Sequence, residues 1–266
     1  MRVGFIGIGN QGAPMAARIV AGGFPLTVYA RRPETLAEFD ASGYEVATTP
    51  AELARTVDVL CTCVRTDADV EALCFGDDGV IAHLSAGSTL VVHSTVHPDT
   101  VRKVASEAAS RGVDVLDAPV SGGAPVAAAG GLLTMVGGDN DVLERCRPVL
   151  ATHSSTIIHL GDVGSGQLAK IVNNALFGAH IALGYGALDL AGRLGLDPQS
   201  MLEVLRNGSG GSFAMNVAGA SASHPEGRER MISLINKDLG LILAVAGDDE
   251  AAQAIVASTR RVFDAD

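Results

Sequence analysis

The N-terminus of the chain joins a short apolar run to a glycine pattern and then to a helix-forming run. Residues 2–6 predict a strand and residues 13–20 a helix, with Gly-x-Gly-x-x-Gly between them. In such a turn the first glycine makes the bend, the second lets the backbone approach a pyrophosphate, and the third lets the helix pack closely. The helix N-terminus then offers amides to an anion. The segment predicts a parallel α/β sheet that binds a dinucleotide through Gly7, Ile8, Gly9, Asn10, Gln11 and Gly12; the alternative is a glycine-rich turn without a ligand.

The second predicted strand, residues 25–30, ends in two arginines, Arg31 and Arg32. A cofactor without a 2′-phosphate is usually held by an Asp or Glu at this place, which binds the ribose hydroxyls. A guanidinium instead suits a 2′-phosphate, because it is planar, charged and bidentate. We therefore predict NADP as the cofactor and NAD as the alternative, while two solvated surface arginines would explain the same residues without a ligand.

Further apolar runs predict more strands of the same sheet, over residues 57–64, 90–93 and 113–119, with 131–138 and 156–160 completing it. Val64 ends one of these strands, and Thr95 follows another at the carboxyl edge, where ligands of open α/β sheets bind. Ser121, Gly122 and Gly123 follow a third strand. A hydroxyl followed by two unhindered amides can hold a carboxylate or carbonyl oxygen. The alternative is a plain tight turn.

Residues 167–193 contain no proline and predict a helix about 40 Å long. Lys170, Asn173 and Asn174 stand at i, i+3 and i+4 of this helix, so they share one face. They are either a solvated polar edge or a proton donor beside two orienting amides. Four glycines inside the helix predict close packing against another helix. No strand is expected after residue 162, and a last helix is expected over 231–246. The chain thus predicts an α/β domain over 1–162 and an all-α domain over 163–266, joined by the long helix.

Composition excludes several classes of protein. Acidic residues number 30 and basic residues 19, which argues against nucleic acid or an anionic membrane as partner. No apolar run of 18 residues and no signal peptide is found, so we expect a cytoplasmic protein. The spacing of Cys61 and Cys63 is not that of a zinc or redox motif, and no metal is expected. The four cysteines are expected to be small buried hydrophobes in a reducing compartment.

Together these residues resemble the β-hydroxyacid dehydrogenase family. Five segments stand in the family's order: residues 7–12, Ser94-Thr95, residues 117–123, residues 164–174, and Lys237-Asp238-Leu239. The third and fourth are specific motifs. The sequence departs from the family in having Gln11 where Met is usual, His93 where an acid often stands, and a shorter helical tail after Ala246.

The resemblance implies a Rossmann-type domain and an NAD(P)-dependent oxidation of a small 3-hydroxy acid, or the reverse reduction of a semialdehyde. It implies Lys170 as the general acid/base. Ser121, Gly122, Gly123 and Asn174 would bind the substrate, and Thr95 and Lys237 would contact the cofactor near the nicotinamide. It also implies a homodimer or a higher even assembly through residues beyond 162.

Two rival functions remain at the level of the sequence. One is an NADP-binding module without catalysis, which would have no need of Lys170 and Asn174. The other is an imine reductase on the same architecture, whose relatives usually lack this lysine. Turnover of small 3-hydroxy acids or semialdehydes discriminates between these functions and a dehydrogenase.

Overall fold

The computed structural model describes residues 1–32, 34–37, 39, 41–222 and 225–263. The chain forms two compact units, Met1–Lys170 and Ile171–Asp266. Residues 264–266, at the end of the predicted second domain, lie outside the described residues. The long helix begins in the first unit and continues into the second.

The first unit is built on a six-stranded parallel sheet of order β3-β2-β1-β4-β5-β6. Its strands are β1 (Val3–Ile6), β2 (Leu26–Tyr29), β3 (Tyr44–Val46), β4 (Val59–Thr62), β5 (Thr89–Val92) and β6 (Asp114–Asp117). This is the strand order of the dinucleotide-binding Rossmann sheet, whose order reverses between β1 and β4. The sequence-based prediction of a Rossmann-type domain is confirmed.

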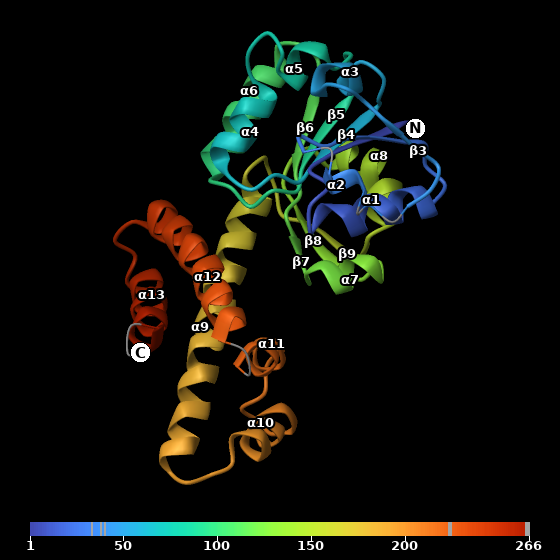
Figure 1. Ribbon diagram of the computed structural model, residues 1–266. Helices are drawn as coiled ribbons and strands as arrows, with labels where there is room; N and C mark the ends of the chain where they lie inside the picture. Colours follow the sequence, from blue (N-terminus) through green and yellow to red (C-terminus); the bar gives the residue numbers. More distant parts are fainter. Residues whose placement is uncertain (33, 38, 40, 223–224, 264–266) are drawn as a thin grey trace. The chain divides into compact units, whose positions relative to one another are not determined.

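Helices cover both faces of this sheet, as a parallel sheet requires (Figure 1). One face packs against α1 (Gly12–Ala21), α7 (Ala124–Ala128) and α8 (Asn140–Leu150), through Met15, Ile19 and Leu143. The other face packs against α3 (Pro50–Ala54), α4 (Asp67–Cys74), α5 (Val80–His83) and α6 (Pro98–Ala109). A short α2 (Glu34–Ala37) follows β2. Burial on both sides explains why the central strands are almost uniformly apolar.

The prediction of one continuous sheet is wrong. Residues 131–138 and 156–160 do not complete the six-stranded sheet, because β8 (Leu132–Val136) and β9 (Ser154–His159) form a separate three-stranded sheet with β7 (Val120–Ser121). The chain leaves the first sheet at Pro119, which has no N–H to donate to a ladder. Its carbonyl instead accepts a hydrogen bond from the Met135 amide, 3.0 Å away, and β7 then pairs antiparallel with β8.

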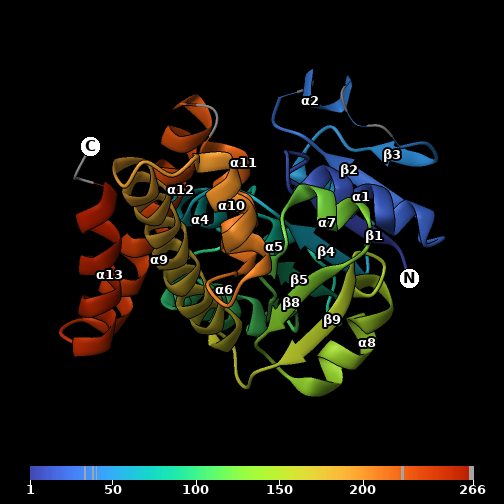
Figure 2. The ribbon, with the colours of Figure 1, turned by 90° about the horizontal axis from the view of Figure 1, so that it is seen from below.

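The second unit is entirely helical within the described residues. It contains most of α9 (Ser165–Arg193), then α10 (Pro198–Asn207), α11 (Phe213–Ala222), α12 (Pro225–Ala246) and α13 (Glu250–Phe263) (Figure 2). The buried core of this unit includes Ile181, Tyr185 and Leu239. The last predicted helix was placed too late in the sequence: α12 begins at Pro225, a residue favoured in the first turn of a helix.

Close packing explains two of the four glycines in α9. A Cβ on Gly178 would meet the Ile235 side chain of α12 at 2.7 Å, and one on Gly184 would meet Met215 of α11 at 2.6 Å. Gly186 has looser neighbours, and the structure shows no contact that requires a glycine at position 192.

Helix α9 also bears on the question of a membrane. Within the described residues it is the one helix long and apolar enough to cross a bilayer by length and composition, and 44% of its most apolar window is buried in the protein. A core helix meets the same criterion, and the packing of Gly178 and Gly184 is that of a core helix.

Candidate active site

The glycine turn after β1 has the geometry that a dinucleotide needs. Gly7 has a φ of +102°, in the region that favours glycine, and a side chain there would strike the Cys63 carbonyl. A Cβ on Gly12 would strike the Gly7 carbonyl at the start of α1, whereas one on Gly9 would enter open space. The backbone at Gly9 is therefore open to a ligand directly before the N-terminus of α1, where a pyrophosphate binds.

A cleft of about 320 Å³ lies beside this turn, at the point where the strand order reverses. It runs from the glycine turn to the arginines after β2 and to the segment after β4; its lining includes Ile6, Gly7, Ile8, Gly9, Tyr29, Ala30, Arg31, Arg32, Thr35, Cys63, Val64, Arg65 and Asp69. Predicted cofactor residues from three separate segments thus line one cleft. The glycine cradle and this lining fit a nicotinamide dinucleotide.

The loop that carries Thr95 is held on both sides of that residue. The Gln167 side chain, fully buried on α9, accepts a hydrogen bond from the Val96 amide at 3.0 Å and donates to the Ser94 carbonyl at 2.8 Å. The Ser94 hydroxyl accepts a hydrogen bond from the Val64 amide at 2.9 Å. The carboxyl ends of β4 and β5 and the first turn of α9 are therefore joined around Thr95, which is half-buried.

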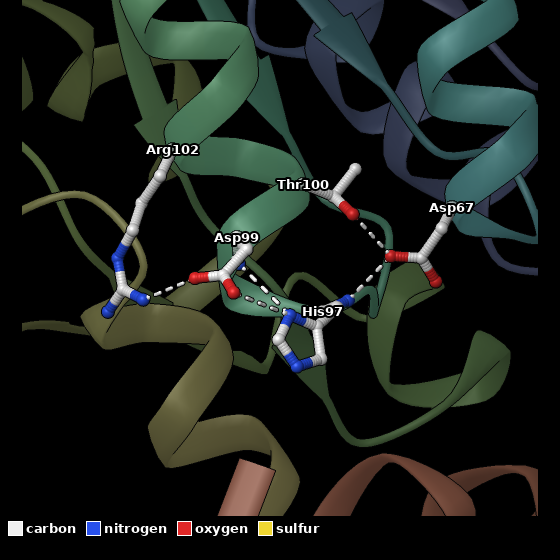
Figure 3. A network of polar contacts seen from close by, with 5 residues as sticks. All are labelled: Asp67, His97, Asp99, Thr100 and Arg102. Carbon is white, nitrogen blue, oxygen red and sulfur yellow. Dashed lines mark hydrogen bonds and ion pairs between the residues drawn. The ribbon is translucent and has the colours of Figure 1, made fainter. Parts of the chain in front are cut away.

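A second set of contacts fixes the other end of the same loop (Figure 3). The Asp67 carboxylate, in the first turn of α4, accepts hydrogen bonds from the His97 amide and the Thr100 hydroxyl, both at 2.7 Å. His97 caps α6 by accepting from the Asp99 amide, and Asp99 pairs with Arg102 at 2.8 Å. These contacts tie the N-termini of α4 and α6 together.

Asp117 anchors the start of α9. Its carboxylate accepts hydrogen bonds from the Gly164 amide at 2.7 Å and the Gln167 amide at 2.8 Å, and the residue is fully buried. Burial raises the pKa of this carboxyl, and the amides of Gly164 and Gln167 oppose the shift. A carboxylate at a helix N-terminus also complements the helix dipole. Asp117 therefore sets the position from which Lys170 projects.

Lys170 lies one turn after Gln167 and is only 8% exposed. One turn further, Asn174 is half-buried and Asn173 exposed. Within the second unit, the Asn174 amide donates to the Asp238 carboxylate of α12 at 2.8 Å, while its Oδ1 accepts from Asn173 at 3.1 Å. Lys237 precedes Asp238 on α12.

Ser121 ends β7, and Gly122 and Gly123 follow with φ values of +133° and +79°. Both glycines occupy conformations that other residues rarely adopt, so the tight turn by itself explains them. A Cβ on Gly122 would meet Val126 at 2.8 Å, whereas one on Gly123 would have only Pro125 nearby, at 3.9 Å. The space at the Cβ position of Gly123 is thus open, whereas that of Gly122 is filled.

Of the predicted site residues, Asn174 and Lys237 lie in the second unit and all others lie in the first. Those in the first unit are Gly7, Ile8, Gly9, Asn10, Gln11, Gly12, Arg31, Arg32, Val64, Thr95, Ser121, Gly122, Gly123 and Lys170. The structure also gives positioning contacts to three residues that were not predicted as site residues, Asp67, Asp117 and Gln167; Asp117 and Gln167 lie in the two specific family segments, and Asp67 lies in none. Among the described residues, no group of three or more His, Cys, Asp or Glu is placed to hold a metal ion.

Comparison with known proteins agrees with this geometry. A family profile described as the NAD binding domain of 6-phosphogluconate dehydrogenase matches residues 2–161. A second, described as NAD-binding of NADP-dependent 3-hydroxyisobutyrate dehydrogenase, matches residues 164–265.

Curated relatives match nearly the whole chain. A 3-hydroxyisobutyrate dehydrogenase of Pseudomonas aeruginosa is 38% identical, over 98% of this chain and 90% of the relative. An NAD-dependent L-serine dehydrogenase of the same organism is 36% identical over 97% of this chain and 87% of the relative. A 2-(hydroxymethyl)glutarate dehydrogenase of Eubacterium barkeri is 34% identical over 99% and 88%.

Solved structures show the same fold. The 3-hydroxyisobutyrate dehydrogenase of Mycobacterium tuberculosis with L-serine has a TM-score of 0.81 and 32% identity, covering 100% of this chain and 95% of that one. Psf3 in complex with NADP+ and 2-OPP has a TM-score of 0.87 and 27% identity, covering 99% and 94%. A Streptomyces aurantiacus imine reductase, at 19% identity and a TM-score of 0.70, covering 100% and 95%, shares the fold alone.

The fold, the glycine cradle and the cleft define an oxidoreductase that uses a nicotinamide dinucleotide, NAD or NADP. The two family profiles and the relatives at 34–38% identity agree on the family of nicotinamide-dependent oxidoreductases to which the chain belongs. The chain belongs to the β-hydroxyacid dehydrogenase family.

Proposed function

We propose that the protein oxidises a small 3-hydroxy acid with NADP, or reduces the corresponding semialdehyde, with Lys170 as general acid/base. The observation that supports this most directly is the burial of Lys170 on α9, where it is 8% exposed. Burying an ammonium group is costly. A catalytic task explains why a lysine stands directly after the turn that Asp117 and Gln167 fix to the carboxyl edge of the sheet.

The chemistry assigned to the chain is proton transfer and positioning. The bound nicotinamide supplies the hydride acceptor. In oxidation, the neutral Nζ of Lys170 takes the hydroxyl proton while the carbon–oxygen double bond forms, and in reduction its ammonium returns that proton. The cofactor is held by Gly7, Ile8, Gly9, Asn10, Gln11, Gly12, Arg31, Arg32 and Val64, with Thr95 and Lys237 beside the nicotinamide.

The relatives narrow the substrate class. By their names they act on 3-hydroxyisobutyrate, L-serine and 2-(hydroxymethyl)glutarate. All three compounds carry a hydroxymethyl group on the carbon that bears the carboxylate. We assign the carboxylate of such a substrate to Ser121, Gly122 and Gly123 and its hydroxyl to Asn174. The hydrogen bond from Asn174 to Asp238 orients the amide and leaves the second N–H of Nδ2 to donate to the oxygen of that hydroxyl, whose own proton goes to Lys170.

Three further assignments belong to this proposal. Arg31 and Arg32, both exposed beside the cleft, favour NADP over NAD. Residues 1–162 carry the cofactor and residues 163–266 serve the substrate and assembly, as a homodimer or a higher even oligomer. The four cysteines are unpaired thiols, which suits the cytoplasm.

A substrate panel tests the proposal. Steady-state rates with NADP and NAD should be measured on 3-hydroxyisobutyrate, serine and 2-(hydroxymethyl)glutarate, on 2-hydroxy acids as controls, and on cyclic imines. Turnover confined to the hydroxymethyl carboxylates is expected. Cofactor binding without turnover would favour a binding module, and reduction of imines alone would favour an imine reductase; either result contradicts the proposal.

A further inference from the structure

An ion pair crosses the cofactor cleft from one wall to the other. Nη1 of Arg31, directly after β2, lies 3.3 Å from Oδ1 of Asp69, in the first turn of α4. Both residues line the cleft. The Arg31 side chain is 80% exposed and the Asp69 side chain 28% exposed, so the arginine is free to move while the acid is the more confined partner.

Asp69 is held in place by its own helix. The Thr66 hydroxyl donates to Oδ2 of Asp69 at 2.8 Å, and the same hydroxyl accepts from the Asp69 amide at 3.1 Å, which caps α4. The pKa of the Asp69 carboxyl lies below its usual value, mainly because the Thr66 hydroxyl donates to it and also because the Arg31 guanidinium is nearby. Two residues earlier, Asp67 ties α4 to α6 (Figure 3). A charged carboxylate is therefore fixed at the rim of the cleft.

The position of this carboxylate matters because of what β2 lacks. In NAD-binding sheets an acid at the end of the second strand accepts hydrogen bonds from the ribose hydroxyls. Here that strand is followed by Ala30, Arg31 and Arg32. The guanidinium of Arg31 would bind the 2′-phosphate of NADP. Oδ1 of Asp69 lies 3.3 Å from that guanidinium, so it is also near the position that the 2′-hydroxyl of NAD would occupy. Asp69, on the opposite wall of the cleft, supplies the carboxylate for the ribose hydroxyls that the residues after β2 do not supply.

We propose that Asp69 is a cofactor-selectivity residue, which accepts a ribose hydroxyl of NAD and competes with the 2′-phosphate of NADP for Arg31. This inference rests on the proposed function, in which Arg31 favours NADP, and adds the residue that limits that preference. With NAD in the cleft the ion pair stays intact. With NADP the exposed Arg31 leaves Asp69 for the phosphate, and the carboxylate then stands beside a like charge.

The test is the affinity for each cofactor, measured by isothermal titration calorimetry with NAD+ and NADP+ on the full chain. Asp69→Asn keeps an acceptor for Thr66 and removes the charge. We expect tighter NADP+ binding and weaker NAD+ binding, so that the ratio of the two Kd values moves toward NADP+ by about tenfold or more. Asp69→Ser is the second variant, with the same expected direction.

Glu71→Gln is the matched control. Glu71 lies on the same helix and forms a comparable ion pair, 2.8 Å from Nζ of Lys103, but it does not line the cleft. Glu71→Gln removes one negative charge from α4, as Asp69→Asn does. The Kd values for NAD+ and NADP+ should stay within about twofold of the parent values, because exposed ion pairs contribute little. In an Arg31→Ala background the NADP+ gain of Asp69→Asn should be smaller than in the parent, because the competition for Arg31 is gone and only the repulsion between carboxylate and phosphate remains.

Two outcomes overturn the inference, and they are distinguishable. If the parent protein binds both cofactors and the ratio of Kd values is unchanged in both folded Asp69 variants, the role of Asp69 is wrong while the proposed function stands. If the parent protein binds neither NAD+ nor NADP+, the cofactor assignment itself is wrong and the inference falls with it.

Discussion

At the scale of single residues, the proposed function depends most on Lys170. Lys170→Met keeps the length and helix propensity of the side chain and removes the proton donor. We expect the variant to fold, to bind the cofactor, and to lose at least about a hundredfold in kcat, because general acid–base catalysis contributes about 10²–10⁴-fold. Steady-state kinetics with the best substrate of the panel measures this.

The control for that prediction is Lys103→Met, which removes an exposed lysine whose partner is Glu71 on α4. This variant should keep the parent kcat. A Lys170→Met enzyme that retains kcat within a few-fold would contradict the catalytic role and leave the proton donor unidentified.

The face of α9 around Lys170 shows what the sequence can predict about single residues and what it cannot. Helical spacing correctly places Lys170, Asn173 and Asn174 near one another, but it cannot say what covers them. The structure divides them into a buried lysine, a half-buried Asn174 bonded to Asp238, and an exposed Asn173. Burial depends on segments distant in the chain, and the sequence pattern of one helix does not contain that information.

At the scale of elements, the N-terminus of α9 depends on Asp117. Asp117→Asn replaces one acceptor oxygen by an NH2 group, so one of the amides of Gly164 and Gln167 loses its partner in a buried place. We expect the free energy of unfolding to fall by about 1.5–3 kcal/mol, the usual contribution of a hydrogen bond to a charged group. Urea denaturation followed by circular dichroism measures the change.

Asp139→Asn tests whether that loss comes from burial. Asp139 caps α8 and is exposed; one of its carboxylate oxygens, Oδ1, accepts from both the Asp141 and Val142 amides, at 2.8 and 3.1 Å, whereas Asp117 uses one oxygen for each amide. Asn is as good an N-cap as Asp, so its cost should stay below about 0.5 kcal/mol. Equal losses in the two variants would contradict the role assigned to Asp117.

The same element explains why parts of the site could not be predicted. The glycine turn and five of the six strands of the first sheet are local patterns that the structure confirms, whereas β3 (Tyr44–Val46) was not predicted. The bonds of Asp117 to Gly164 and Gln167 join residues 47 and 50 positions apart, and that of Gln167 to Val96 spans 71. The second sheet was missed for a related reason, since strand periodicity identifies β8 and β9 but not the strands with which they pair.

At the scale of the whole molecule, two buried histidines connect stability to pH. His93 and His153 lie edge to face with ring centroids 5.3 Å apart, 3% and 0% exposed, and the His93 Nδ1 bonds to the Ala118 carbonyl at 2.7 Å. Burial lowers the pKa of His93 to about 4. Burial, and the neighbouring His93 after it, lower the pKa of His153 well below its usual value.

Because both pKa values are lower in the folded state, the unfolded chain binds more protons in acid. The contribution of these two neutral histidines to the free energy of unfolding is fully present above pH 6.5 and is lost as the pH falls toward 4. Between pH 7.5 and 5 the protonation of the unfolded chain at His93 should lower the free energy of unfolding by about 2 kcal/mol, and His153 acts in the same direction. We expect the free energy of unfolding of His153→Leu to fall less than that of the parent over this interval, measured by urea denaturation at both pH values. An equal loss in the two proteins would contradict this account.

Assembly is the other property of the whole molecule that the proposal includes. Leu176, Leu183 and Leu190 stand seven residues apart on α9 and are 50%, 56% and 48% exposed. A heptad row of exposed leucines on one helix is an apolar stripe that a second copy of the chain can cover. We therefore expect light scattering at micromolar concentration to give at least twice the monomer mass of 27.1 kDa.

Substitution of that stripe locates the interface. Leu183→Glu places a charge in the middle of the row, where burial against a partner would leave it without compensation. The variant should shift toward the monomer mass as the concentration falls, while its circular dichroism spectrum stays that of the parent. Ile158→Glu, on the exposed side of β9 at 43% exposure, changes an apolar residue outside the proposed interface and should leave the mass unchanged. A parent protein of monomer mass would contradict the dimer, and a dimer that persists in Leu183→Glu would move the interface away from this stripe.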